Sequence, residues 1–220
     1  MLVINLKAYK ETIGKKGLEL LEAAERVVSE YGIEIVIAPQ FTDIYLLSQR
    51  AKRVKIFAQH IDPIESGAFT GHILPEAVKE AGAVGTLVNH SERQLKISEI
   101  EKIIEIAKKL GLKTIVCAND NLVGSALAKL DPDYIAIEPP ELIGTGISVS
   151  KAKPDIIVNS VRMIKEANPR VKLLVGAGIS NKDDVKRAIE LGAEGVLLAS
   201  AVAKAPNFYE KIKELAEGFK

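Results

Sequence analysis

The residues best suited to chemistry lie in the second half of the chain, where a carboxylate ends an apolar run. Glu138 closes that run, and the two prolines at positions 139–140 restrict the backbone directly after it. Gly144 and Gly146 allow wide backbone freedom a few residues later, so the intervening segment could swing as a nearly rigid flap. A carboxylate beside such a flap is typical of a catalytic base under a closing lid. The pattern predicts proton transfer by Glu138.

Polar residues also follow two other apolar runs. Asn5 and Lys7 are two positions apart, so both side chains point to the same side of a strand, and an inward lysine is costly to bury unless it meets an anion. His90 precedes the sequence Ser-Glu-Arg at 91–93, where a short helix could start and disfavour a charged imidazole. Lys7 is equally compatible with a solvated strand end, and a lone histidine after a strand is more often structural. Both alternatives stay open at this point.

Two groups of small residues predict an anion site. The Gly-Ala-Gly sequence at 176–178 leads toward a helix that we expect to begin near Ser180, and Ala199 with Ser200 opens another short helix. Backbone NH groups at helix starts bind phosphate, and a phosphate site built from the last two loops recurs in barrels of alternating strands and helices. Close packing is the alternative explanation for these small residues.

These residues follow short apolar runs that alternate with segments of helical period, the arrangement typical of a parallel sheet covered by helices. Residues 78–88 also resemble residues 188–198, at an offset of half the chain. Eight strand–helix units in one domain favour a closed (β/α)8 barrel, an α/β fold, over an open doubly wound sheet. The polar side chains would then meet at one mouth. The strands are expected to begin near Leu2, Ile33, Lys55, Val84, Lys113, Asp133, Val171 and Gly195.

Local signals predict the helix ends. Ser98 with Glu101, and Ser180 with Asp183, are expected to form capping pairs at helix starts. Glycines that separate a helical segment from the next strand are expected to form left-handed caps, and they are Gly32, Gly82, Gly111 and Gly192.

Composition limits the class of protein. At 220 residues and 47% hydrophobic content, the chain can bury one core, and we expect residues 1–220 to form a single catalytic domain. The 30 basic and 29 acidic residues give no basic area suited to nucleic acid, and no apolar run reaches the roughly 18 residues of a membrane span. A single cysteine, Cys117, and the lack of a secretory signal pattern indicate a cytoplasmic protein. Cys117 falls in the fifth run and is expected to be a core thiol.

In their order along the chain, these motifs resemble the triosephosphate isomerase family, and in particular its shorter archaeal form, over nearly the whole sequence. The resemblance implies a single-domain TIM barrel that interconverts dihydroxyacetone phosphate and D-glyceraldehyde 3-phosphate by proton transfer through an enediolate, in glycolysis and gluconeogenesis. It implies no cofactor and no metal, although His60, Asp62 and His72 could be drawn as metal ligands. The motifs are Asn5-Leu6-Lys7, Phe69-Thr70-Gly71-His72, Asn89-His90-Ser91-Glu92-Arg93, Ile137-Glu138-Pro139, Ile143-Gly144-Thr145-Gly146, Gly176-Ala177-Gly178 and Leu198-Ala199-Ser200.

The resemblance also implies roles for individual residues. Glu138 would be the base and His90 the electrophile, a pairing of carboxylate and neutral imidazole for which this family is itself the standard example. Lys7 and Asn5 would stabilise the enediolate, and Glu92 would support Lys7 from behind. The substrate would be held by Asn5, Leu6, Lys7, Ile143, Gly178, Ala199 and Ser200.

The chain departs from the commoner bacterial and eukaryotic pattern of the family at three places. Residues 140–142 replace an aromatic lid, residues 199–200 replace a Gly-Gly pair, and Gln94 replaces an arginine of a supporting ion pair. The first two are similar to the archaeal branch, which implies a homo-oligomer, a tetramer, with the loop around Thr70 near an interface.

Two other functions are alternatives to triose phosphate isomerisation. Another phosphate-binding barrel, such as a ribulose-phosphate epimerase or a tryptophan-pathway isomerase, lacks the combination of Asn5, Lys7, His90 and a hinged Glu138. A sensor or scaffold that only binds phosphate would not require a base.

Overall fold

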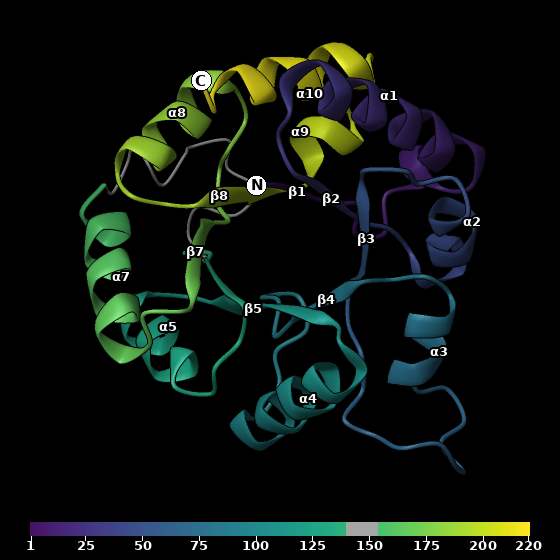
Figure 1. The fold of residues 1–220 in the computed structure, drawn as a ribbon, viewed down its shortest axis with the longest axis vertical. Coiled ribbons are helices and arrows are strands. Elements are labelled where there is room, and N and C mark those ends of the chain that lie inside the picture. Colours follow the sequence, from purple (N-terminus) through teal and green to yellow (C-terminus); the bar gives the residue numbers. More distant parts are fainter. Residues whose placement is uncertain (140–153) are drawn as a thin grey trace.

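A computed structural model describes residues 1–139 and 154–220, which form a closed barrel of parallel strands inside a ring of helices (Figure 1). Each strand pairs with the next one along the chain, and β1 pairs with β8 to close the sheet. The (β/α)8 barrel predicted from the sequence is confirmed, and every strand begins within two residues of its predicted position. The strands are β1 (Leu2–Asn5), β2 (Ile35–Ala38), β3 (Lys55–Ala58), β4 (Gly85–Val88), β5 (Lys113–Ala118), β6 (Tyr134–Ile137), β7 (Lys172–Val175) and β8 (Gly195–Leu198).

The helices alternate with the strands and turn an apolar face toward the barrel. In α1, for example, Leu20, Leu21 and Ala24 are buried at helical spacing. The hydroxyl of Tyr209 on α10 donates to Glu30 Oε2 of α1 at 2.7 Å, which joins the two ends of the ring. The helices are α1 (Lys15–Tyr31), α2 (Ile44–Ser48), α3 (Pro75–Glu80), α4 (Ile97–Leu110), α5 (Asn121–Ala128), α7 (Pro154–Ala167), α8 (Lys182–Glu190), α9 (Ser200–Ala203) and α10 (Phe208–Glu217).

Two apolar layers hold the barrel together, one on each face of the sheet. Along β1, Leu2 and Ile4 pack against the helices, whereas Val3 belongs to a smaller cluster. This smaller cluster fills the barrel interior, because strand side chains alternate between faces and the helix residues all belong to the larger layer. By the same alternation, Asn5 and Glu138 continue the inward rows of Val3 and Ala136 at the carboxyl mouth.

The glycine caps are confirmed, but the predicted capping pairs are wrong by one or two positions. Gly32 and Gly111 close α1 and α4 with φ of 68° and 71°. At the start of α4, the Lys96 backbone NH donates to Oε2 of Glu99 at 2.8 Å, in place of a pair between Ser98 and Glu101, because the helix begins earlier than expected. At α8, Asn181 accepts from the Asp184 backbone NH at 3.0 Å, so the cap lies one residue after the predicted Ser180.

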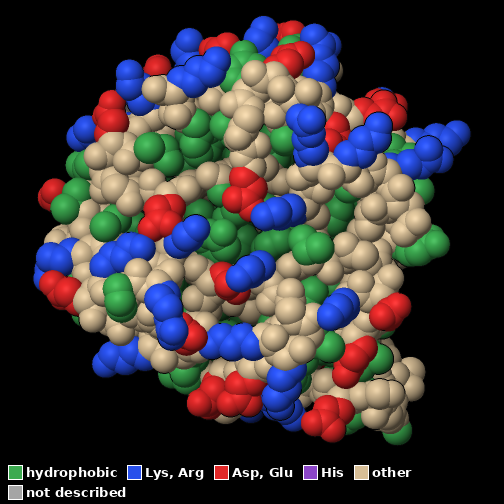
Figure 2. Space-filling view, viewed as in Figure 1, with side chains coloured by type: hydrophobic (Ala, Val, Ile, Leu, Met, Phe, Trp, Pro, Cys, Tyr) green, Lys and Arg blue, Asp and Glu red, His purple; other side chains and the backbone are tan. Residues whose placement is uncertain are grey.

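The surface carries charges of both signs. Basic and acidic side chains are interspersed over the face in Figure 2 and do not gather into one basic area. No helix in the described parts of the chain is long and apolar enough to cross a membrane.

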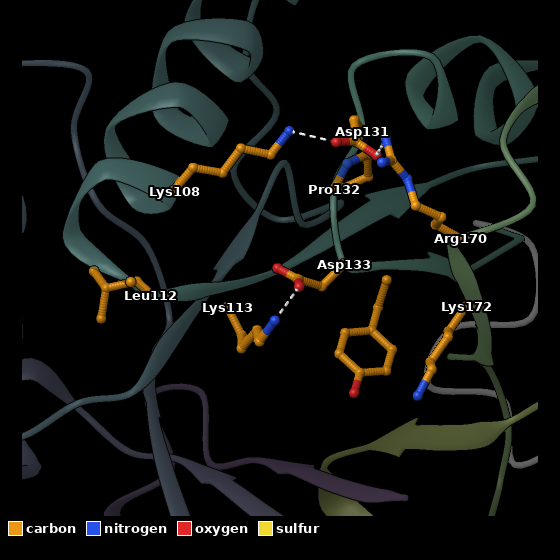
Figure 3. Close-up of a pocket in the computed structure, with 10 residues that line it drawn as sticks. Lys108, Leu112, Lys113, Asp131, Pro132, Asp133, Arg170 and Lys172 are labelled. Carbon is orange, nitrogen blue, oxygen red and sulfur yellow. Dashed lines mark hydrogen bonds and ion pairs between the residues drawn. The ribbon is translucent and has the colours of Figure 1, made fainter.

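A hollow at the amino ends of β5, β6 and β7 is lined by paired charges (Figure 3). Asp131 accepts from Lys108 Nζ at 2.8 Å and from Arg170 at 3.0 Å, and Lys113 Nζ lies 2.6 Å from Asp133. Asp131 also has a positive φ of 61°. These contacts tie together the loops that precede β6 and β7, so this mouth of the barrel is a structural one.

Candidate active site

A cavity of about 560 Å³ opens at the carboxyl ends of the strands, and most of the predicted site residues line it. Asn5 lies beneath this lining, and the Leu6 side chain packs between the barrel and the helices, away from the cavity. Ile143 and the rest of the predicted lid, 140–146, lie outside the described residues. The lining consists of Lys7, Tyr9, His90, Glu92, Glu138, residues 176–180, residues 197–201 and Lys204.

Glu138 directly follows β6 and is only 2% exposed. Its Oε2 atom is buried and has no hydrogen-bond partner in the described part of the chain. Burial raises the pKa of Glu138 to about 7, because the ionised carboxylate is poorly solvated there, while a hydrogen bond from Cys117 and the charge of Lys7 oppose the rise. The result is a carboxyl group that exchanges a proton near neutral pH.

Gly176 provides the space that Glu138 occupies. A β-carbon at position 176 would lie 2.4 Å from Cγ of Glu138 and 3.1 Å from Oε1. Any side chain larger than hydrogen would therefore push the carboxylate out of its position.

Asn89 turns the chain so that His90 faces the cavity. It has a positive φ of 59°, a conformation that asparagine adopts more readily than most residues. Its amide donates to the Cys117 carbonyl at 2.9 Å and accepts from the Leu95 NH at 2.9 Å, which fixes the loop. His90, 7% exposed, then lies with Nε2 3.6 Å from Oε1 of Glu138.

The hydrogen bonds around His90 define its neutral form. The backbone NH of Glu92 donates to Nδ1 at 3.1 Å, so the ring proton must sit on Nε2, which faces Glu138. Burial lowers the pKa of His90 to about 4, with a further lowering by Lys7. The prediction of a short helix at residues 91–93 is wrong, since these residues form a turn and α4 begins only at Ile97. Burial and Lys7, not a helix terminus, keep the imidazole neutral.

Lys7 brings a positive charge to the cavity. Its Nζ atom lies 2.7 Å from Oε1 of Glu92, and only 15% of its side chain is exposed. Its backbone NH donates to Oδ1 of Asn5 at 2.9 Å. The geometry therefore joins three predicted site residues in one group beside Glu138 and His90.

The two turns of small residues lie on the same wall of the cavity. Gly178, with φ of 70°, follows β7, and Ser200 begins α9 after β8. The backbone NH groups of Val202 and Ala203 donate to the Ala199 carbonyl, so the NH groups of Ser200 and Ala201, at the start of α9, are the ones that can face an anion. This wall can bind a group with several acceptor oxygens.

The residues considered as metal ligands have other partners. His60 Nε2 lies 2.9 Å from Oδ1 of Asp62, whose Oδ2 accepts from the Ile73 NH at 2.6 Å. The ring of His72 stands edge-on to Phe69. In residues 1–139 and 154–220, no group of three or more His, Cys, Asp or Glu is placed to hold a metal ion.

Several residues of the site were not predicted from the sequence. Cys117 is buried in the barrel interior, where burial raises the pKa of its thiol and the thiol donates a hydrogen bond to Glu138. The residue type of Asn89 is a sequence signal for its backbone conformation, since asparagine tolerates a positive φ. Gln40 and Gln59, whose side-chain amides donate to the Lys7 carbonyl, carry no sequence signal of this role, because a glutamine after a strand is ordinarily solvated.

The fold is a closed (β/α)8 barrel, and the C-terminal ends of its strands carry a carboxyl group of near-neutral pKa beside an uncharged imidazole. These features are those of a barrel enzyme that catalyses proton transfer by general acid–base chemistry. A family model for triosephosphate isomerase matches residues 1–215, and the chain belongs to that family.

Relatives named triosephosphate isomerase agree with this assignment over 94–98% of the chain. The protein of Methanocaldococcus jannaschii is 54% identical over 215 residues, covering 98% of each chain. That of Methanothermus fervidus is 47% identical and spans 98% of this chain and 96% of the relative. That of Methanobacterium bryantii is 51% identical over 94% of this chain and 91% of the relative. The activity is thus the interconversion of dihydroxyacetone phosphate and D-glyceraldehyde 3-phosphate, a step of glycolysis and gluconeogenesis.

Proposed function

We propose that Glu138 and His90 carry out the interconversion of the two triose phosphates in the cavity at the carboxyl mouth. The observation that carries this proposal is the pair itself. A buried carboxyl group with an unpartnered oxygen lies 3.6 Å from the protonated nitrogen of a neutral imidazole. Such a carboxylate can accept a carbon-bound proton, and the imidazole can donate to the substrate oxygens.

The proton transfer would proceed in two balanced steps. Glu138 removes a proton from carbon 1 of dihydroxyacetone phosphate, the C–H electron pair forms a carbon–carbon double bond, and the carbonyl electrons move onto oxygen to give an enediolate. Glu138 then returns the proton to carbon 2, while His90 helps move a proton between the two oxygens. No redox partner or water is consumed.

Lys7, Asn5 and the small-residue wall would bind and stabilise the charged species. The ammonium group of Lys7 attracts the dianionic substrate and the developing oxyanion, and Asn5 holds the Lys7 backbone. Backbone NH groups near Gly178, Ala199 and Ser200 would take the phosphate. Glu92 contacts Lys7 at 2.7 Å and would orient it, and we propose Ile143 as a further phosphate ligand.

The assembly belongs to the same proposal. The exposed loop that includes Thr70 runs out between β3 and α3 (Figure 1), closed at its base by the backbone bond from Asp62 to Ile73 at 3.0 Å. Phe69 on this loop is 45% exposed. Ile97 and Val123, which are 69% and 41% exposed, line a separate hollow, and Leu122, the neighbour of Val123 in the sequence, is 67% exposed. Two separate apolar areas suit two kinds of subunit contact. A homotetramer with the Thr70 loop at one interface is the form we propose.

Light scattering with size-exclusion chromatography tests the assembly. Phe69→Asp and Leu122→Lys should each reduce the tetramer to a smaller species. A wild-type monomer would overturn the proposal.

We also place the protein in the cytoplasm, since its one thiol, at Cys117, is free and buried.

A coupled triose phosphate assay on Glu138→Ala tests the catalytic proposal. Loss of a general base should lower kcat by about 10²–10⁴-fold. The matched control is Glu105→Ala, an exposed glutamate on α4 that should leave turnover unchanged. Near-normal turnover by a Glu138→Ala variant with a normal circular dichroism spectrum would refute the assignment.

A further inference from the structure

Lys7 has a backbone conformation that its residue type avoids. Its φ is 46°, in the left-handed region, although lysine carries a β-carbon that crowds its own backbone there. Such a conformation persists only where the surrounding structure holds it in place, and it concentrates at functional sites. The contacts that hold Lys7 are therefore informative about the site.

Both polar groups of the Lys7 backbone are bonded to side chains. The NH donates to Asn5 Oδ1 at 2.9 Å. The carbonyl oxygen accepts from the side-chain amide of Gln59 at 2.9 Å and from that of Gln40. A carbonyl oxygen only accepts hydrogen bonds, so both glutamines must present their NH2 groups to it. Two donors thus converge on a single oxygen.

The two glutamines are anchored to the barrel. Gln40 follows β2, which pairs with β1, and Gln59 follows β3, the next strand beyond β2 in the sheet. The Gln59 amide also donates to the carbonyl of Ala38, the last residue of β2, at 3.0 Å. The position of the Lys7 carbonyl is therefore fixed relative to the rigid sheet and not to a loop.

Fixing this carbonyl fixes the direction of the lysine side chain. A return of Lys7 to an extended conformation would turn its carbonyl away from both amides and its Cα–Cβ bond away from the cavity. In the observed conformation Nζ lies against Glu92 at 2.7 Å and lines the cavity with His90 and Glu138. Both glutamines are uncharged, so they orient the ammonium group without altering the charge that meets the substrate.

We propose that Gln40 and Gln59 are positioning residues that hold Lys7 in its left-handed conformation for catalysis. This inference rests on the proposed role of Lys7. The glutamines touch neither substrate nor reacting atoms, and they act through the Lys7 carbonyl.

A double-mutant cycle tests the inference. The variants are Gln40→Met and Gln59→Met, which keep the side-chain length and remove the donors, each alone and combined with Lys7→Met. Gln49→Met, at an exposed glutamine that follows α2, is the matched control. For every variant, kcat/KM is measured at enzyme concentrations that quantify residual turnover, and Tm is measured beside it.

Each glutamine variant should lower kcat/KM about tenfold, while its Tm stays within a few degrees of wild type. In the Lys7→Met background, the same glutamine substitution should lower kcat/KM by less than about twofold. Wild-type kcat/KM in both glutamine variants, or an undiminished loss in the Lys7→Met background, would overturn the inference and leave the proposed function intact. A loss of Tm with unchanged kcat/KM per folded molecule would show a merely structural role and overturn it as well. Wild-type activity in Lys7→Met alone would instead refute the proposed role of Lys7.

Discussion

The Nε2 atom of His90 lies 3.6 Å from Oε1 of Glu138, and burial inverts the order in which the two side chains titrate. In water a carboxyl group loses its proton before an imidazolium does. Here burial raises the pKa of Glu138 to about 7 and lowers that of His90 to about 4. At neutral pH the imidazole is an uncharged donor, and the carboxylate gains or loses a proton at little cost. This is the state that proton transfer at carbon requires.

The first prediction concerns the pH dependence of catalysis. The base must be ionised, so kcat/KM should fall about tenfold per pH unit below a pKa near 7, and His90 should add no break above pH 5. The phosphate of the substrate itself titrates near pH ~6 and adds to the acid limb. A direct probe is therefore required as well.

Difference infrared spectroscopy supplies that probe. A band from a protonated carboxyl group should disappear as the pH rises through about 7 and should be missing in Glu138→Gln. A wild-type protein whose carboxyl bands have all disappeared by pH 5.5 would contradict the raised pKa of Glu138.

The second prediction is that Glu138 lowers the stability of the fold. Its pKa in the folded protein lies above the ordinary value of 4.5, so the folded state binds more protons than the unfolded state between pH 4.5 and about 7. The free energy of unfolding must fall as the pH rises through that window. Glu138→Gln stays neutral, so at pH 8 it should be more stable than wild type by on the order of 3 kcal/mol. At pH 4 the difference should vanish.

Thermal unfolding at both pH values measures this effect, with Glu105→Gln as the exposed control. An equal difference between Glu138→Gln and wild type at pH 4 and pH 8 would show that the ionisation of Glu138 has no influence on stability.

The sequence predicts the barrel well because its signals are local. Eight apolar runs alternate with segments of helical period, and glycine caps follow four of those segments. Glu138 continues the inward row of β6, so its orientation follows from strand alternation alone. His90 breaks this rule. It is directed into the cavity by the positive φ of Asn89, and no periodicity encodes such a reversal.

Contacts between distant segments could not be predicted in the same way. The bond from Gln59 to Lys7 spans 52 positions, and the bond from Asn89 to Cys117 spans 28. Each depends on which strands become neighbours and on their register. The sequence therefore identifies which residues carry the chemistry, while the closed sheet determines which residues hold them.

The third prediction concerns the space beside the base. Gly176→Ala would place a β-carbon 2.4 Å from Cγ of Glu138, so the carboxylate must move and kcat/KM should fall by about 10²-fold. Gly67→Ala is the control, since its β-carbon meets only ordinary contacts at 3.6 Å and beyond. An intact crystal structure of Gly176→Ala with wild-type kcat/KM would show that the position of Glu138 is not critical.

The fourth prediction concerns Asp131 at the opposite mouth of the barrel. Hydrogen bonds from Lys108 and Asn168, with the charges of Lys108 and Arg170, lower the pKa of this carboxyl group to about 2. A depressed pKa contributes stability above the ordinary value of 3.8, and that stability is lost as the pH falls toward 2. Asp131→Asn removes the charge but keeps a residue that tolerates the φ of 61°, whereas Asp131→Ala removes the acceptor and the tolerance together.

At pH 7 we therefore expect Tm to fall by a few degrees in Asp131→Asn and by more in Asp131→Ala, with kcat/KM unchanged in both because Asp131 lies at the amino mouth. Thermal unfolding between pH 2 and pH 7 should show the deficit of Asp131→Asn shrinking as the acid protonates the wild-type carboxylate. If the difference in Tm between Asp131→Asn and wild type stays constant down to pH 2, the charge of Asp131 does not stabilise the contacts between these loops. A loss of kcat/KM would mean that this mouth is coupled to catalysis, against the division of roles between the two ends of the barrel.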